Sequence, residues 1–156
     1  MGVSGSGKTT IGKALATKLG WDFYDADDFH TSENKAKMKA GIPLNDDDRA
    51  PWLASLNTLI SKCLKENNSG VLACSALKEC YRQILLSGNN RMLLVFLKGD
   101  YDLIWGRMMA RSDHYMRPEM LRSQFEVLEE PTYGLVVDIS QQVEKIVATI
   151  IEYTLN

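Results

Sequence analysis

Glycines at positions 2, 5 and 7, followed directly by Lys8 and Thr9, constrain this chain more than any other feature of its sequence. Residues 2–9 read GVSGSGKT and match every fixed position of the pattern GxxxxGK[ST]. Glycines let backbone N–H groups converge on one anion, and a helix beginning beside Lys8 adds the positive end of its dipole. The segment predicts a phosphate-binding loop, since a glycine-rich turn before a helix needs neither Lys8 nor Thr9.

The loop also predicts which residues hold a nucleotide and its metal ion. Lys8 is the candidate catalytic cation on the phosphates, and the Thr9 hydroxyl is a candidate Mg²⁺ ligand. The candidate nucleotide-binding residues are Gly2, Ser4, Gly5, Ser6, Gly7, Lys8, Thr9 and Thr10.

Short apolar runs alternate along the chain with longer helical patterns, which indicates βαβ units and an α/β fold. The runs predict strands at 21–25, 70–74, 92–97 and 135–138. The helical patterns predict helices at 8–19, 32–40, 77–87, 101–111, 118–129 and 141–154. Another helix should follow Asp46–Asp48, with Pro51 in its first turn, and reach about Glu66. We expect three layers, with helices on both faces of a parallel sheet.

Size and composition predict one domain that spans residues 1–156. The chain has 45% hydrophobic residues, no internal repeat and no tract that would serve as a linker. Its 18 Lys and Arg against 20 Asp and Glu give a formal charge of −2, so nucleic acid is not an expected partner. With no apolar run of about 20 residues and no signal-peptide pattern, we expect no membrane span and a cytoplasmic protein.

Two local patterns qualify this outline. A phosphate-binding loop of this type follows a buried strand, yet the sequence starts one residue before Gly2, so we expect the first strand before Met1. Cys63, Cys74 and Cys80 have neither CxxC spacing nor a histidine-rich neighbourhood, and we expect them to be free thiols.

Asp25 and Asp27 stand where the predicted strand 21–25 ends, which is the ligand side of an open α/β sheet. Such a pair suits a division of labour in which Asp25 holds Mg²⁺ and Asp27 accepts the proton of an attacking hydroxyl. The alternative is an acidic turn that caps the next helix.

Basic residues gather in the segment 107–122, where Arg107 and Arg111 share a helix face and Arg117 and Arg122 follow. This pattern favours a lid that brings guanidinium charge to the transferred phosphoryl group, with Arg107 and Arg111 as candidate catalytic residues. The alternative is a solvated face that pairs with nearby glutamates.

A second group of cations follows the predicted strand 70–74. Lys78 and Arg82 are four residues apart and suit an anion, although a helix start with surface cations explains them equally well. His30 and His114 lack companion ligands, so they do not indicate a metal site.

The chain resembles the P-loop gluconokinases over nearly its whole length. The matching blocks are MGVSGSGKTT at 1–10, DADDFH at 25–30, GIPLNDDDRAPWL at 41–53, CSALK with YR within 74–82, LKGDYDLI at 97–104 and SQFEVLEEP at 123–131. The first block alone indicates a nucleotide binder, whereas GIPLNDDDRAPWL together with CSALK is much more specific.

The resemblance implies a nucleoside-monophosphate-kinase-like fold and ATP-dependent phosphorylation of D-gluconate to 6-phospho-D-gluconate, with Mg²⁺ and, as an expectation, a homodimer. It implies these candidate substrate-binding residues: Asp27, His30, Arg49, Lys78, Arg82 and His114. The sequence departs from the pattern at Asp113, which stands where the family more often has glycine, and in the short connection 132–134.

Three other functions remain open at this stage. A kinase of another small metabolite such as shikimate would share the loop and the Asp-x-Asp pattern, although GIPLNDDDR argues against it. A nucleotide-dependent switch would need no Asp27, and its guanine-reading Asn-Lys-x-Asp motif is absent from the sequence. A catalytically inactive regulatory module is the third.

Overall fold

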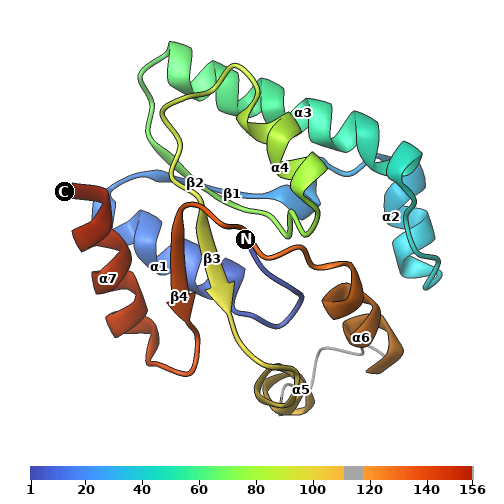
Figure 1. Cartoon of the computed structure of the whole chain (residues 1–156). Helices are drawn as coiled ribbons and strands as arrows, with labels where there is room; N and C mark the ends of the chain where they lie inside the picture. The colour runs from blue at the N-terminus through green and yellow to red at the C-terminus, as the bar shows by residue number, and fades with distance from the viewer. Residues whose placement is uncertain (111–117, 156) are drawn as a thin grey trace.

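The computed structural model describes residues 1–110 and 118–155, and its helices alternate with parallel strands (Figure 1). The elements are α1 (Lys8–Leu19), β1 (Asp22–Asp25), the 3-10 helix η1 (Ala26–Phe29), α2 (Ser32–Lys39), α3 (Asp46–Lys65), β2 (Gly70–Ala73), α4 (Glu79–Leu86), β3 (Val95–Lys98), α5 (Tyr101–Met109), α6 (Pro118–Val127), β4 (Leu135–Asp138) and α7 (Val143–Leu155). The predicted α/β class with a parallel sheet flanked by helices is confirmed.

The described strands form two parallel pairs rather than one continuous sheet. β1 pairs with β2, with Asp22 opposite Gly70, and β3 pairs with β4, with Val95 opposite Leu135. Met1 and Gly2 lie between the pairs: the Leu97 N–H donates to the Met1 carbonyl at 3.0 Å, and the Gly2 N–H donates to the Ser75 carbonyl at 3.2 Å. The chain leading into the nucleotide loop therefore joins the two halves of the sheet.

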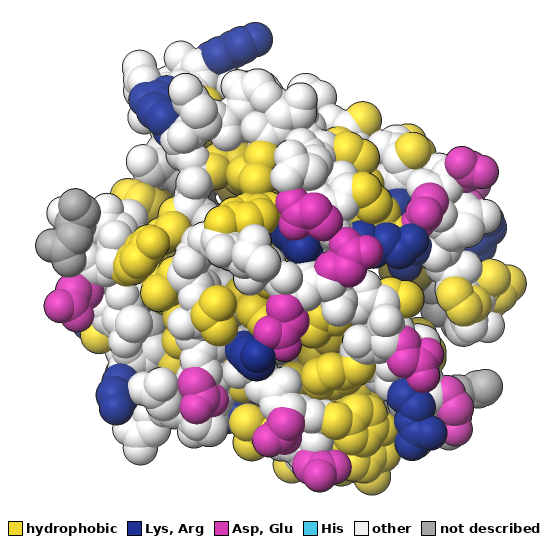
Figure 2. Space-filling model, in the orientation of Figure 1, with side chains coloured by type: hydrophobic (Ala, Val, Ile, Leu, Met, Phe, Trp, Pro, Cys, Tyr) yellow, Lys and Arg dark blue, Asp and Glu magenta, His cyan; other side chains and the backbone are white. Residues whose placement is uncertain are grey.

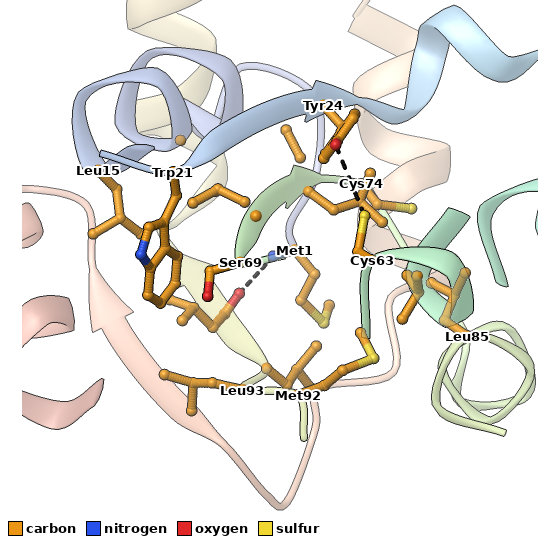
Figure 3. Close-up of a pocket in the computed structure, with 18 of the residues that line it drawn as sticks. Met1, Leu15, Trp21, Tyr24, Cys63, Ser69, Cys74, Leu85, Met92 and Leu93 are labelled. Carbon is orange, nitrogen blue, oxygen red and sulfur yellow. Dashed lines mark hydrogen bonds between the residues drawn. The ribbon is translucent and has the colours of Figure 1, made fainter. Parts of the chain in front are cut away.

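An apolar slot continues from Met1 between β2 and β3 (Figure 3). It is a cavity of about 500 Å³, and among its lining side chains are Leu15, Trp21, Leu72, Leu93 and Ile150. The Met1 nitrogen donates to the Val95 carbonyl at 2.5 Å, and burial lowers the pKa of this amino group to about 5. The slot lies where a strand between β2 and β3 would run.

Helices cover both faces of the sheet. Val71 packs against the cluster that contains Ile11 and Leu15 of α1, whereas the next residue, Leu72, packs against the cluster of Leu53 and Leu56 of α3. Because successive side chains of a strand point to opposite faces, α1 and α3 lie on opposite sides of β2. The expected three layers are present, with α7 beside α1 and α4 beside α3 (Figure 1).

Several element ends differ from the sequence prediction for local reasons. The Asn45 side chain accepts from the Asp48 N–H, and Asp48 accepts from the Asn45 N–H, so α3 begins at Asp46 and Pro51 lies beyond its first turn. Helix α4 begins at Glu79 rather than at residue 77, because Ala76 has a left-handed φ of +42° and Lys78 is extended. The prediction also missed η1.

The exposed charges are mixed (Figure 2), and the thiols agree with expectation. Acidic and basic side chains are interspersed among the described residues of the face shown in Figure 2, so neither sign dominates this face. Cys63, Cys74 and Cys80 are free cysteines as predicted, and burial raises the pKa of the Cys74 thiol to about 11. Within 1–110 and 118–155, no helix is long and apolar enough to cross a membrane.

Candidate active site

The nucleotide loop begins with a tight turn. The Ser6 N–H donates to the Val3 carbonyl at 3.2 Å, and Gly5, the third residue of this turn, has a φ of +79°. A β-carbon on Gly5 would lie 2.8 Å from Met108 Cγ and 2.9 Å from Ile104 Cγ2, both on α5. The positive φ requires glycine here, as is typical of the third residue of a type II turn, and the close approach of α5 leaves no room for a side chain.

The N-terminus of α1 is left open by the protein. Its N-cap, Gly7, has a φ of +91°, and no described side chain caps it, whereas Thr31, Asn45 and Asp100 cap α2, α3 and α5. The first N–H groups of a helix have no partner within the helix. With no acidic residue in its first turn, α1 presents these donors and its positive dipole end to an anion.

Lys8 and Asp27 act on each other electrostatically. Burial lowers the pKa of the Lys8 amine, and the charge of Asp27 is the strongest influence in the opposite direction. The Lys8 Nζ donates to the Val3 carbonyl at 2.9 Å, so the lysine also braces the turn of the loop. Lys8 and Asp27 thus lie in one electrostatic environment at the N-terminus of α1.

Asp25 uses both of its carboxylate oxygens in hydrogen bonds. Its Oδ2 accepts from the Thr9 hydroxyl at 2.9 Å, while its Oδ1 accepts from the Asp27 N–H at 3.2 Å and caps η1. Hydroxyl and carboxylate oxygens suit Mg²⁺, which usually keeps waters and takes only one or two protein ligands beside substrate phosphates. The Thr9–Asp25 pair fits such an ion, although within the described chain no group of three or more His, Cys, Asp or Glu forms a complete metal cage.

His30 and Trp52 form a buried wall next to Asp27. Their rings stack at 4.5 Å between centroids, and the Trp52 Nε1–H donates to the Ala26 carbonyl at 2.7 Å. His30 is 9% exposed, and its Nδ1 has no hydrogen-bond partner among the described residues. Burial lowers the pKa of His30 and so favours the neutral ring, although the charge of Asp27 acts in the opposite direction.

A polar cluster connects the start of α3 with α4. The Lys78 Nζ lies 3.0 Å from Asp46 Oδ1 and 5.4 Å from the centre of the Tyr81 ring, and the Tyr81 hydroxyl donates to the same carboxylate. Arg49 lies over the Tyr81 ring at 5.7 Å and donates to the Leu44 carbonyl. The Arg49 charge also lowers the His30 pKa, so this cluster and the histidine share one electrostatic environment.

Arg82 is directed away from this cluster into the protein. Its side chain is 1% exposed; Nη1 donates to the carbonyls of Ala76 and Leu77 at 2.9 and 3.0 Å, and Nη2 donates to Glu79 Oε2 at 2.6 Å. These contacts leave little of the guanidinium for a substrate. The geometry favours a role in holding the 76–79 connection.

The remaining candidates are Arg107 on α5, three residues of the nucleotide loop and the start of α1, and two residues of the expected lid. Arg107 donates to the Ile139 carbonyl at 2.6 Å, beyond the end of β4. Ser6 is fully buried and its Oγ has no partner in the described structure, whereas Thr10 is exposed on α1 and Gly2 has a φ of +147°. Arg111 and His114, with the middle of the expected lid 107–122, lie outside the described residues.

Sequence reasoning overlooked three residues that the fold brings to this region. The sequence pattern marks Asp46 only as part of an acidic helix start and Trp52 only as part of a matching block. Gln124, on α6, contacts Ser4 of the nucleotide loop through two hydrogen bonds across 120 residues of sequence. All three lie within GIPLNDDDRAPWL or SQFEVLEEP, so those blocks were the available signal.

Comparison with known sequences identifies relatives that are all small-molecule kinases. The family model described as shikimate kinase matches residues 4–154. The chain is 43% identical to a probable gluconokinase of Mus musculus, with 97% of this chain and 94% of that protein covered. It is 46% identical to the thermoresistant gluconokinase of Escherichia coli K12, over 97% of this chain and 89% of that protein.

Comparison with solved structures agrees. The crystal structure of a gluconokinase from Sinorhizobium meliloti 1021 superposes with a TM-score of 0.88 at 38% sequence identity, over 99% of this chain and 89% of that one. The likeness therefore extends over the whole fold as well as the motifs.

Proposed function

The chain belongs to the shikimate kinase family and within it to the gluconokinases, and from this premise we propose how its residues phosphorylate D-gluconate with ATP. The observation that carries the proposal is the open N-terminus of α1, with Lys8 and Thr9 beside Asp25 and Asp27. It combines an anion site, a metal-ligand pair and a candidate base. These are the parts that phosphoryl transfer to a hydroxyl requires.

The loop binds and orients the nucleotide. Backbone N–H groups at the start of α1 hold the phosphates, and Lys8 exchanges its contact with the Val3 carbonyl for a phosphate oxygen. Thr9 and Asp25 hold Mg²⁺, which when bound neutralises charge on the phosphates. Arg107 is proposed to add positive charge, which would require it to leave the Ile139 carbonyl.

Asp27 is the proposed general base. It orients the terminal hydroxyl of gluconate and accepts its proton as the hydroxyl oxygen bonds to the γ-phosphorus and the bond from that phosphorus to ADP breaks. Because the transition state for phosphoryl transfer is loose, Asp27 need not generate a free alkoxide. Orientation and late proton transfer are sufficient.

The far end of gluconate carries a carboxylate, which requires a cation. Arg49 and Lys78, which flank the Tyr81 ring, are the proposed partners, and Arg49 is the stronger candidate because a guanidinium binds a carboxylate through two bonds. Neutral His30 is proposed to contact a substrate hydroxyl through the small part of its ring that is exposed. Arg82 holds the 76–79 connection, which contains Lys78, in place.

The setting of the reaction follows from the family alone. We expect a cytoplasmic enzyme that uses ATP and Mg²⁺, acts as a homodimer and needs no nucleic acid. Sedimentation at several protein concentrations would test the dimer.

An ADP-release assay tests the function directly. The purified chain is given ATP and Mg²⁺ with gluconate, shikimate, glycerate, glucose or a nucleoside monophosphate as acceptor, and a reaction without acceptor is the control. Gluconate should give by far the highest kcat/KM. Faster turnover of shikimate would contradict the proposal, and nucleotide binding without acceptor-dependent turnover would indicate a switch or an inactive module.

A further inference from the structure

Gln124 on α6 forms a two-bond contact with Ser4 in the nucleotide loop. The Ser4 N–H donates to Gln124 Oε1 at 2.7 Å, and Gln124 Nε2 donates to Ser4 Oγ at 3.0 Å. Both donors and acceptors are partly buried, and the two residues are 120 positions apart in the sequence. Such a contact constrains the loop in both position and orientation, because two bonds fix the amide plane relative to the serine.

The place of Ser4 in the turn explains why this contact matters. The Ser6 N–H and the Lys8 ammonium both donate to the Val3 carbonyl, and these bonds close the turn from residue 3 to residue 6. Ser4 is the second residue of that turn, so its own N–H is not used in closing it. Gln124 supplies the missing acceptor.

Helix α6 is itself held firmly enough to act as a support. Leu121, one turn before Gln124, is fully buried in the cluster that contains Val3, Ile104 and Met108. After the helix, the Glu129 N–H donates to the Leu77 carbonyl at 2.9 Å. Gln124 therefore projects from a helix that is anchored in the core.

We propose that Gln124 is a positioning residue for nucleotide binding: it holds Ser4 so that the following N–H groups, up to the start of α1, stay directed at the phosphates. The inference rests on the proposed function only in taking a nucleoside triphosphate as the ligand of the loop. Gluconate itself is not involved. Loss of the contact therefore weakens binding of ATP and leaves the acceptor site intact.

The test uses Gln124→Met, which keeps most of the side-chain volume and removes both hydrogen bonds. The dissociation constant of the chain for ATP with Mg²⁺, measured by calorimetry, should rise about tenfold, because ATP must then order the loop that the two hydrogen bonds hold in the wild type. The KM for gluconate should change little, whereas the melting temperature should fall by a few degrees, because both hydrogen bonds are also present in the ATP-free chain. Glu126→Gln, an exposed change on the same helix, is the matched control and should leave the ATP affinity as in the wild type.

A double-mutant cycle separates positioning from packing. Ser4→Ala removes only the bond to Ser4 Oγ, so its effect and that of Gln124→Met should be less than additive in ATP affinity. Unchanged ATP affinity in Gln124→Met would overturn the inference, as would a loss of gluconate affinity equal to the loss of ATP affinity, which would indicate general damage to the site. Because ATP binding is measured without acceptor, these outcomes are distinct from a failure of the wild type to phosphorylate gluconate.

Discussion

Replacing Arg82 separates two roles that the sequence leaves open for it. A substrate-binding arginine would lose gluconate affinity at unchanged stability, whereas the arginine in this structure should lose stability first. Its side chain is 1% exposed and donates to two carbonyls and to Glu79. The Ala76 carbonyl belongs to a residue held at a φ of +42°, a strained conformation for alanine that this hydrogen bond helps to maintain.

The magnitude follows from these partners. In Arg82→Ala the Ala76 carbonyl loses the guanidinium, while the Leu77 carbonyl keeps the Glu129 N–H, and the Arg82–Glu79 ion pair is lost as well. A charged hydrogen bond contributes about 1.5–3 kcal/mol and an orphaned buried acceptor costs about 1–3 kcal/mol. Together they reduce the free energy of unfolding by about 3–5 kcal/mol, a large part of the 5–15 kcal/mol typical of a domain.

Urea denaturation measures this loss. With a slope of about 2 kcal/mol per molar urea, the midpoint should fall by about 2 M. Arg91→Ala is the control, because Arg91 also donates to a carbonyl, that of Leu64 at 2.6 Å, but from an exposed position where changes stay within about 0.5 kcal/mol. A wild-type midpoint in Arg82→Ala, together with a tenfold higher gluconate KM, would refute the supporting role and return Arg82 to the substrate.

Three further predictions test the site. Asp27→Asn should lower kcat by about 10²- to 10⁴-fold with ATP affinity nearly unchanged, whereas Asp25→Asn, which alters the partner of the Thr9 hydroxyl, should shift the Mg²⁺ dependence; equal defects in ATP binding would contradict the division of labour. Arg49→Ala should raise the gluconate KM at least tenfold, and the exposed Lys62→Ala should not; a normal KM in Arg49→Ala would exclude Arg49 as the carboxylate partner. Burial lowers the His30 pKa, so as the pH falls below about 6.5 the unfolded chain binds a proton at this residue before the folded chain does. Acidification should therefore lower the urea midpoint of the wild type more than that of His30→Gln. An equal fall of the two midpoints with pH would contradict this prediction.

The parts of the site that local sequence determines were predictable, and the parts that depend on distant contacts were not. Gly5 and Gly7 adopt positive φ because the loop requires it, and the motif alone indicates that. For Asp25 the sequence offered metal binding or helix capping, and the structure shows one oxygen on Thr9 and the other on an N–H. The sequence pattern around Asp25 does not show that its two carboxylate oxygens accept hydrogen bonds from two different groups.

The direction of a side chain depends on residues that the local pattern does not contain. Arg82 and Lys78 are both cations on one short helix start, yet Lys78 reaches Asp46 across 32 residues of sequence and Arg82 is drawn inward by the left-handed turn at Ala76. Gln124 contacts the loop across 120 residues. These contacts follow from how the helices pack, which spacing along the chain does not encode.

The slot between β2 and β3 carries the last prediction. Met1 already pairs with β3 in parallel register, since its nitrogen donates to Val95 and its carbonyl accepts from Leu97, and the Gly2 N–H donates to Ser75, two residues beyond β2. An extended apolar segment joined to the Met1 nitrogen would continue this pairing along Gly70–Ala73, and an amide N–H would keep the bond to Val95 without a buried amine. Such a strand would complete the sheet.

A pair of N-terminal extensions tests this strand. Five β-branched residues placed before Met1 should fill the cavity of about 500 Å³, raise the melting temperature by about 5 °C or more and slow hydrogen exchange in β2 and β3. An extension of the same length made of glycine and serine can pair but buries little apolar surface, so it should stabilise the chain much less. Equal melting temperatures for the two extended chains would show that the slot does not take an apolar strand, because the β-branched side chains would then gain nothing from burial in the cavity.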